Sequence, residues 1–267
     1  MTVELRARRA TVAIPAVLAL SAGLLGAASA DDPQDSEVSA SANARKSKGY
    51  NILSKDEGYP YIARWNPCQK IHYKINARKS PRAGFVKDTL KAVKRLHRAS
   101  GLRFTYQGRT KTVPNIHSPK RYKGKTDLVI AWTTPKKRQV LKNLGGWGGG
   151  YWWRVSKRTG KFTKGWVLLN SKYRYKYPKG FGKGPRGGYG TRGQLLMHEL
   201  GHSMGLAHVE RRSEIMFHYT YRRKAKWGNG DRKGLRKVGQ PAGCIRSKAP
   251  NSAPVRSANP HEYADQG

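Results

Sequence analysis

The stretch His198-Glu199-Leu200-Gly201-His202-Ser203-Met204-Gly205-Leu206-Ala207-His208 decides which fold and chemistry are expected of this chain. Residues four apart lie on one face of an α-helix, so His198 and His202 can offer their imidazoles to one metal ion. Gly205 can adopt the left-handed backbone conformation that ends helices, which lets the chain turn and return His208 as a third ligand. Three protein ligands leave a fourth position open for water, as in catalytic zinc sites.

Glu199 follows the first of these histidines and cannot easily share its coordination position. Its carboxylate can instead reach a water molecule at the open position and take the proton of that water, which is the role of a general base. The run before the motif offers Thr191 as a helix cap, followed by good helix formers. The sequence therefore predicts a helix from about Thr191 to Met204.

A methionine completes the pattern, because Met216 lies eight residues after His208 within Ser213-Glu214-Ile215-Met216-Phe217-His218-Tyr219. HExxHxxGxxH followed by a methionine turn resembles the metzincin clan of zinc metalloproteases. The spellings Gly201 and Gly205-Leu206 are most similar to matrixins and to matrixin-like secreted bacterial proteases. The resemblance implies a zinc endopeptidase with one catalytic zinc ion held by His198, His202 and His208, with Glu199 as base and proton shuttle, and with Met216 as the apolar floor.

The same resemblance implies the fold class. We expect an α+β metzincin-like fold in which a twisted, mostly parallel sheet with an antiparallel edge strand packs on an N-terminal helix and a zinc-site helix, followed by a small C-terminal subdomain. The resemblance extends over about Trp65–Ile245, but only Thr191–Tyr219 is specific. By analogy, Gly148–Trp153 is expected to be an exposed edge strand that pairs with an extended substrate.

Two positions depart from the named subfamilies. Val209 follows the third histidine where those subfamilies show Ser, Asp or Glu, so no subfamily is assigned. Tyr219 lies three residues after Met216, whereas the astacin pattern places its transition-state tyrosine two residues after the methionine. Two interpretations of Tyr219 stay open, an oxyanion partner and a tyrosine packed in the pocket wall.

The other histidines have no ligand partners at useful spacing, so packing or surface roles are expected for them. His218 is expected near the cleft because it belongs to the methionine turn. The rest of this group consists of His72, His97, His117 and His261.

Composition divides the chain into four segments. Residues 1–30 carry three arginines before an Ala/Leu/Val-rich stretch and end in Ala28-Ser29-Ala30, which predicts a secretory signal peptide rather than a membrane anchor. Residues 31–58 are expected to be a disordered leader or short propeptide, 59–247 the catalytic domain and 248–267 a flexible tail. We therefore expect a secreted, extracellular and monomeric protein, either free or associated with the cell wall, with no membrane span in its mature form.

The two cysteines, Cys68 and Cys244, lie before the first predicted strand and after the last predicted helix. A bridge between them would tie the two ends of the domain together in an oxidising compartment. The alternative is that Cys68 blocks the zinc ion as in matrixin propeptides, but Asn66-Pro67-Cys68 does not resemble that switch motif. A Cys68–Cys244 disulfide is therefore the prediction.

Hydrophobic periodicity predicts the other elements. A helix is expected over Gly84–Ser100, with Val86, Leu90, Val93 and His97 on one stripe and Phe85, Ala92 and Leu96 beside it. Strands are expected at Ile71–Ile75, Leu102–Tyr106, Asp127–Trp132, Gly146–Arg154 and Gly165–Asn170, the last two around a Thr159-Gly160 turn. Of Trp152 and Trp153, one ring is expected in the core and one outside. A last helix is expected over Asp231–Val238.

Charge is the other unusual feature, with a formal net charge of +39. The span Leu128–Met197 contains no aspartate or glutamate, and its segment 171–190 interleaves cations with tyrosines and lacks an apolar stripe, which predicts a surface insertion. We expect Lys172, Arg174, Lys176 and Lys179 to bind a polyanion such as an anionic wall polymer or an acidic protein. A solvated face that serves only solubility is the alternative, and no nucleic-acid-binding fold accompanies the segment.

The same scarcity of carboxylates argues against calcium sites of the matrixin type, since only Asp127 could ligate through a carboxylate between Asp88 and Glu199. Protein or peptide substrates, acidic ones among them, are expected for the zinc site. The competing function is a non-enzymatic, polyanion-binding or adhesive secreted protein on a metzincin scaffold. An intact Glu199 favours the enzyme, because a binding protein has no need of a general base.

Overall fold

The computed structural model describes residues 49–81, 84–118, 122–220, 222–246 and 255–256. The predicted signal peptide lies outside the described residues, as do the leader up to residue 48, His261 and most of the predicted tail. No helix among the described residues is long and apolar enough to cross a membrane.

A single large sheet carries the fold, with the strand order β4-β3-β5-β7-β6-β9 and with β2 paired to β7. All its pairs are parallel except those of β6, which runs antiparallel to both β7 and β9. The mostly parallel sheet with an antiparallel strand near one edge is therefore confirmed. The strands are β2 (Ile62–Arg64), β3 (Ile71–Asn76), β4 (Phe104–Arg109), β5 (Leu128–Thr133), β6 (Gly146–Arg154), β7 (Thr159–Asn170) and β9 (Val255–Arg256).

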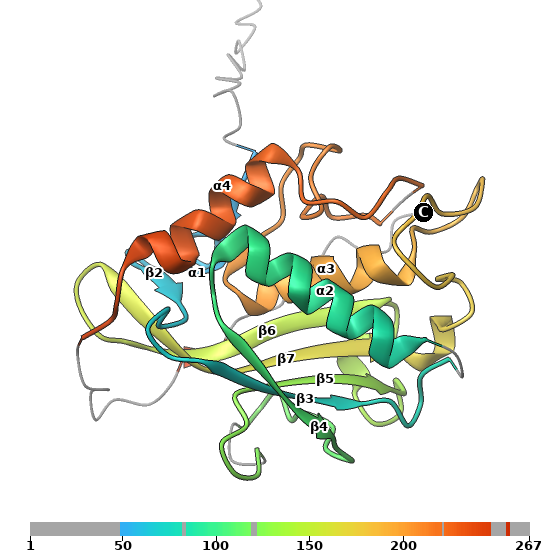
Figure 1. The fold of residues 1–267 in the computed structure, drawn as a ribbon, viewed down its shortest axis with the longest axis horizontal. Coiled ribbons are helices and arrows are strands. Elements are labelled where there is room, and N and C mark those ends of the chain that lie inside the picture. The colour runs from blue at the N-terminus through green and yellow to red at the C-terminus, as the bar shows by residue number, and fades with distance from the viewer. Residues whose placement is uncertain (1–48, 82–83, 119–121, 221, 247–254, 257–267) are drawn as a thin grey trace, which may run out of the picture. The chain divides into compact units, whose positions relative to one another are not determined.

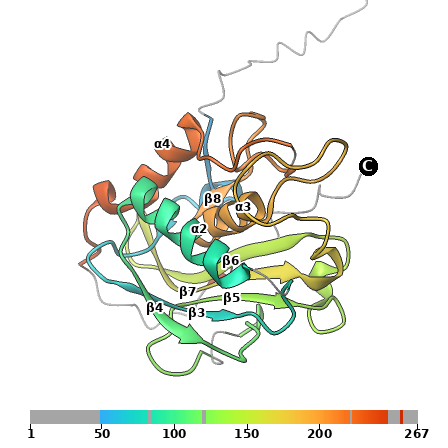
Figure 2. The same ribbon diagram turned by 45° about the vertical axis from the view of Figure 1, so that its right-hand side comes forward.

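Helices cover one face of this sheet. Helices α2 (Phe85–Ser100) and α3 (Arg192–Ser203) lie over the strands, and α4 (Asn229–Val238) lies beyond α2 (Figures 1 and 2). This is the expected packing of the sheet on an N-terminal helix and a zinc-site helix. The short elements are α1 (Leu53–Asp56) and the 3₁₀ turns Gln139–Leu141, Ser171–Tyr173 and Gln240–Ala242.

The helix predicted over Gly84–Ser100 is observed as α2, and part of its predicted apolar face is buried. The buried apolar residues are Phe85, Ala92, Val93 and Leu96, and Val86 is partly buried against the core. Leu90 and His97 are exposed, so the predicted stripe is wrong at these two positions. Packing partners choose the buried side: Phe85 meets Trp132 of β5 edge to face, with ring centroids 5.8 Å apart.

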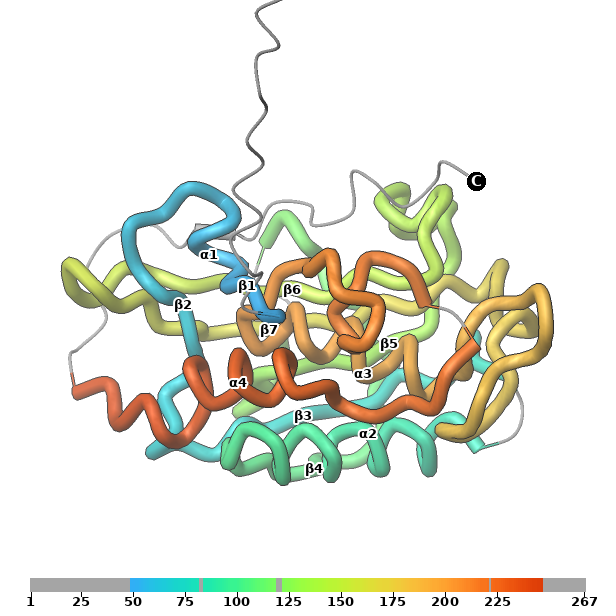
Figure 3. Tube along the Cα trace, turned by 90° about the horizontal axis from the view of Figure 1, so that it is seen from above, coloured from blue at the N-terminus to red at the C-terminus, as the bar shows by residue number. Residues whose placement is uncertain are grey.

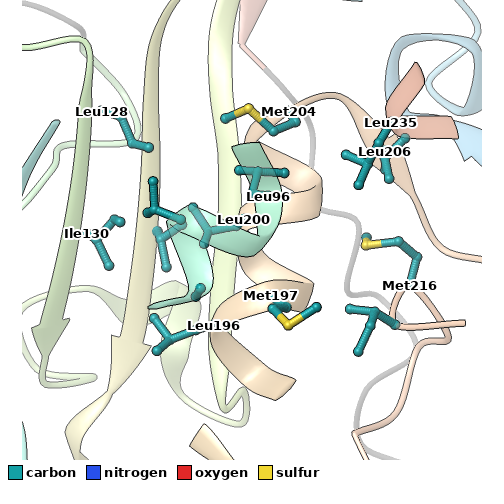
Figure 4. Close-up of a cluster of buried hydrophobic side chains, with 14 of the residues drawn as sticks. Leu96, Leu128, Ile130, Leu196, Met197, Leu200, Met204, Leu206, Met216 and Leu235 are labelled. Carbon is teal, nitrogen blue, oxygen red and sulfur yellow. The ribbon is translucent and has the colours of Figure 1, made fainter. Parts of the chain in front are cut away.

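The core lies between α3 and the sheet. Figure 4 shows Leu196 and Leu200 of α3 between the helix axis and Leu128 and Ile130 of β5, with Met216 on the opposite side of the helix. Helix α3 is buried along its whole length. Burial on all sides fixes the height and rotation of this helix above the sheet, and those determine where its polar side chains lie.

The folded domain begins before Tyr59, the expected start. Residues 51–56 form β1 (Asn51–Ile52) and α1, and Ile52 and Leu53 are buried. β1 pairs with β8 (Leu206–Ala207), the segment that leaves α3 after Gly205 (Figure 3). Disorder, one of the two alternatives for residues 31–58, is thus wrong for residues 49–58. No local signal in the sequence indicates this order, because the short strand completes its hydrogen bonds only on a distant part of the chain.

The hairpin between β6 and β7 also differs from expectation. The backbone N–H of Val155 donates to the carbonyl of Thr159, so the turn lies at residues 155–158. Thr159-Gly160 is not a turn, because both residues belong to β7, where Gly160 pairs with Arg154 of β6 and with Ala63 of β2. Strand β7 therefore begins at Thr159, six residues before the predicted start at Gly165.

Cys68 and Cys244 form a disulfide with a Cα–Cα distance of 5.4 Å. In a chain-entropy description, closing a loop with a sequence separation of 176 destabilises the unfolded state by about 5 kcal/mol. Hydrogen bonds reinforce the connection: Arg64 donates to the carbonyls of Ala242 and Gly243, and Asn66 exchanges two hydrogen bonds with the backbone of Ile245. The two ends of the domain are thus joined both covalently and by buried polar contacts.

Candidate active site

Helix α3 begins and ends close to the predicted positions. Thr191 is its N-cap residue, as expected, but its side chain makes no capping hydrogen bond. The start of the helix is held instead by a buried ion pair in which Arg192 donates to Asp88 of α2 at 2.7 Å, and the backbone N–H of Gly180 donates to the same carboxylate. Nothing in the sequence marks this pair, because its partners lie about a hundred residues apart.

The turn after α3 is made by Gly205, whose φ of +100° favours glycine over other residues. Its carbonyl accepts a hydrogen bond from Leu53 and its N–H donates to the carbonyl of His202. The reversed chain then brings His208 beside the helix, as the sequence predicts.

The three histidines converge on one point. The Nε2 atoms of His198, His202 and His208 lie 3.1 to 3.2 Å from one another. His198 and His202 are buried, and His208 is half-buried. They form the only group of three or more potential metal-ligating side chains within the described ranges.

The other ring nitrogens show that this cluster fits a metal ion. Nδ1 of His198 lies 2.8 Å from the carbonyl oxygen of Ile215, and Nδ1 of His202 lies 2.8 Å from that of Leu206. A carbonyl oxygen only accepts, so both Nδ1 atoms carry the proton and both Nε2 atoms turn lone pairs toward the centre. Two ligands of a tetrahedral zinc ion are about 3.4 Å apart, close to the observed spacing. A cation at the centre would remove the electrostatic repulsion between the facing lone pairs.

Glu199 lies against the first residues of β6. It is 1% exposed, and a Cβ added at Gly146 would lie 2.6 Å from its Oε1 atom. A Cβ at Gly148 would overlap its carbonyl oxygen and lie 2.7 Å from its carbonyl carbon. The two glycines therefore let β6 approach the helix backbone directly beside the carboxylate. Glycine at alternate positions of a strand is the sequence signal from which this close approach could have been predicted.

The expected exposed edge strand is not observed. Residues Gly146–Trp152 of β6 are buried, and β9 pairs with the outer edge at Tyr151 and Trp152. That pairing also makes Val255 and Arg256 part of the sheet, where a flexible tail was expected. The prediction for the tryptophans is confirmed, because Trp152 is fully buried and Trp153 is only half-buried.

Met216 is buried against Gly201 of the helix that carries His198 and His202. It is 1% exposed, and a Cβ added at Gly201 of α3 would lie 3.1 Å from its Cε atom. Val209, the unusual residue after the third histidine, forms a bridge with Phe217, and its N–H donates to the carbonyl of Met216. The backbone of Val209 thus ties the third ligand to the methionine turn whatever its side chain is.

A buried carboxylate that the sequence analysis did not single out holds the methionine turn. Asp231 at the start of α4 accepts hydrogen bonds from the backbone N–H groups of Ile215, Met216 and Gly228. Burial raises the pKa of Asp231 to about 6, against the lowering effect of these hydrogen bonds and with a further rise from Glu214. Since the carbonyl of Ile215 orients His198, Asp231 supports a ligand through one intermediate residue.

Tyr177 is a second buried residue near the site that no motif in the sequence indicated. It belongs to the basic segment yet is only 6% exposed, and its hydroxyl lies against Gly145, immediately before β6. Burial raises the pKa of its phenol, a hydrogen bond with Thr220 opposes the rise, and the charge of Glu199 adds to it. The segment 171–190 is therefore not wholly a surface insertion, because Tyr177 and the buried Phe181 anchor it to the domain.

The four predicted polyanion-binding residues of this segment are less buried than Tyr177 and Phe181. Lys172, Lys176 and Lys179 are exposed and Arg174 is half-buried. Lys176 lies 5.0 Å from the ring centroid of Tyr173 and 5.1 Å from that of Tyr189. Cation–π contacts of this kind hold charges in place without neutralising them.

Tyr219 and His218 follow Met216. The Tyr219 side chain is 40% exposed, more than expected of a tyrosine packed in a pocket wall, and its ring meets that of His218 at 4.7 Å. His218 lies near the cluster, with its ring centroid 6.2 Å from that of His208, as expected.

The other described histidines lie outside the cluster. Nδ1 of His72 lies 3.0 Å from one carboxylate oxygen of Asp127, and Nζ of Lys164 lies 3.5 Å from the other. This carboxylate therefore already has two basic partners. Nδ1 of His97 bonds the carbonyl of Leu102, and His117 is exposed. These are the packing and surface roles predicted.

The close approach of β6 to α3 gives a prediction. We expect Gly148→Ala to lower the free energy of unfolding by about 3 kcal/mol, because the new methyl group overlaps helix backbone, which cannot rotate away. Gly182→Ala is the matched control, since a Cβ there meets nothing within 4 Å. Chemical denaturation of both variants measures the difference. Equal stability of the two variants would contradict this close approach of strand and helix.

Comparison with known families agrees with this geometry. Residues 153–238 match the family model of matrixin, a peptidase family, and the match includes α3, the turn, the three histidines and the methionine turn. No curated protein matches the chain. The matched segment and the three-histidine cluster on the mixed α+β fold make the chain similar to matrixin-like metzincins.

Proposed function

We propose that the protein is a secreted zinc endopeptidase. The observation that carries the proposal is the convergence of three Nε2 atoms at 3.1 to 3.2 Å, beside a buried glutamate that follows the first ligand. Peptidase chemistry and protein substrates follow from the matrixin match. The predicted signal peptide and the Cys68–Cys244 bridge support secretion.

In this mechanism His198, His202 and His208 would hold a single zinc ion, and their orientation comes from backbone carbonyls and the Gly205 turn. Bound zinc would polarise the scissile carbonyl group and lower the pKa of a nearby water molecule. Glu199 takes the proton of the attacking water and returns it to the leaving amine. Burial of Glu199 against Gly146 holds the carboxylate in one position, which lowers the entropy cost of orienting the base toward the attacking water.

The experiment that tests this function is zinc analysis of the purified mature protein together with digestion of a peptide library. We expect about one zinc ion per chain and cleavage at internal peptide bonds. A chain that contains zinc but leaves every peptide of the library intact would favour the non-enzymatic alternative.

The basic segment supports a second part of the proposal, that the protein binds polyanions through Lys172, Arg174, Lys176 and Lys179. Three of these charges make cation–π contacts with neighbouring tyrosines, and Lys172 and Lys176 share the ring of Tyr173. None of the four has a carboxylate partner in the part of the chain that the structure describes. An anionic wall polymer or an acidic protein would supply the missing counter-charge.

We expect replacement of these four residues with Gln to weaken retention on an anionic matrix while cleavage of a neutral peptide changes little, because none of them contacts the histidine cluster. The matched control removes the same number of positive charges elsewhere, by replacing the exposed lysines Lys142, Lys157, Lys233 and Lys237 with Gln. The salt concentration needed for elution measures retention, since screening shortens to about 3 Å at 1 M salt. Equal loss of retention in both variants would show that only net charge matters.

A further inference from the structure

A hollow separate from the histidine cluster lies between α2, α3 and the segment that enters α4. Its volume is about 530 Å³, within the range of sites that hold small organic ligands. Neither the three histidines nor Glu199 line it. Its walls come from parts of the chain more than a hundred residues apart, so no sequence motif marks it.

Cations dominate the walls of this hollow. They are Arg95 and Arg98 of α2, Lys224 and Lys226 of the loop after the methionine turn, and Arg232 of α4, and no aspartate or glutamate lines the hollow with them. Among the described residues none of these five forms an ion pair. Burial lowers the pKa of Arg95, and the neighbouring charge of Arg98 lowers it further. An anion bound among the five would offset that repulsion.

The remaining walls are apolar and buried. Phe181, Met197 and Trp227 are 8%, 0% and 5% exposed. The Arg95 guanidinium lies 4.2 Å from the ring centroid of Phe181 and donates to the carbonyl of Ala225. Two contacts thus hold this guanidinium in place before any ligand arrives, which lowers the entropy cost of binding.

Trp227 completes the aromatic wall. Its side chain is 5% exposed and lines the hollow together with Phe181. The hollow therefore combines several cations with an aromatic wall.

We propose that this hollow binds a phosphate monoester, with the phosphate among the cations and the organic group against Phe181 and Trp227. A phosphate monoester presents three terminal acceptor oxygens and up to two charges, which suits donors that approach from α2, α4 and the loop between them. A carboxylate has only two oxygens and one charge. The monoester is either a small soluble molecule or a phosphomonoester group carried by a polymer, and the site recognises the same group in both.

Calorimetric titration with phenyl phosphate tests this site. We expect one saturable site per chain that persists at 0.15 M salt, and binding of benzoate at least about tenfold weaker. The variant Arg98→Gln/Lys226→Gln removes two exposed cations that form no ion pair among the described residues, so it should fold normally and bind phenyl phosphate at least about tenfold more weakly. The control Lys142→Gln/Lys157→Gln removes the same charge elsewhere and should bind within about twofold of the parent protein.

Three results would overturn the proposal. Equal weakening in the control would mean that only net charge is sensed. Undiminished affinity in Arg98→Gln/Lys226→Gln would place the bound phosphate outside this hollow. Benzoate or an acidic peptide binding as tightly as phenyl phosphate would exclude phosphate recognition. If the site is supported, comparison of phenyl phosphate with a polymer that carries phosphomonoester groups identifies which source binds more tightly.

Discussion

We expect Glu199→Ala to retain its zinc ion and to lose about 10²- to 10⁴-fold in kcat for peptide cleavage, as removal of a general base predicts. The glutamate is buried against Gly146 and is not one of the three converging ligands, so its loss should leave the metal in place. Metal content and peptide hydrolysis are measured on the same preparation.

Glu210→Ala is the control for this variant, because Glu210 is an exposed carboxylate two residues after the third histidine. It should keep both zinc and activity. Turnover by Glu199→Ala at the rate of the parent protein would exclude the proposed mechanism. Loss of zinc together with activity would show that Glu199 supports the metal site rather than the chemistry.

Removal of zinc by a chelator should abolish hydrolysis and also lower the melting temperature. The facing Nε2 lone pairs of His198, His202 and His208 lose the cation that relieves them. An ion present at a hundred times its Kd stabilises the folded state by about 2.7 kcal/mol, so the shift is large enough to measure. Added zinc should restore both activity and melting temperature.

His202→Ala separates ligand loss from other effects of the chelator. This variant should be inactive and its melting temperature should respond little to chelation, because one of three ligands is missing. His117→Ala, a change at an exposed histidine outside the cluster, should behave as the parent protein does. Persistent hydrolysis after complete removal of zinc would contradict the assignment of a metallopeptidase.

How much of the site is predictable depends on the distance over which each contact acts along the chain. Spacings within the stretch 198–208 predict the zinc cluster, because helix geometry places residues four apart on one face and glycine permits the turn. Met216 follows from spacing as well. The edges of the fold do not: β1 and the first six residues of β7 have weak apolar patterns, and their hydrogen bonds are completed by distant strands.

The sequence by itself determined the metal-binding motif and the excess of positive charge, because each is a property of residue type and local spacing. The fold class followed from the family resemblance of that motif, and the half-cystine pair from the presence of only two cysteines. Tertiary structure alone decided what surrounds the motif. Asp231 reaches the methionine turn, Tyr177 approaches Gly145, and Gly148 admits β6 to the backbone of Glu199. These contacts join segments fifteen to about fifty residues apart, and which side chains meet across such distances depends on how the whole core packs, not on any local pattern.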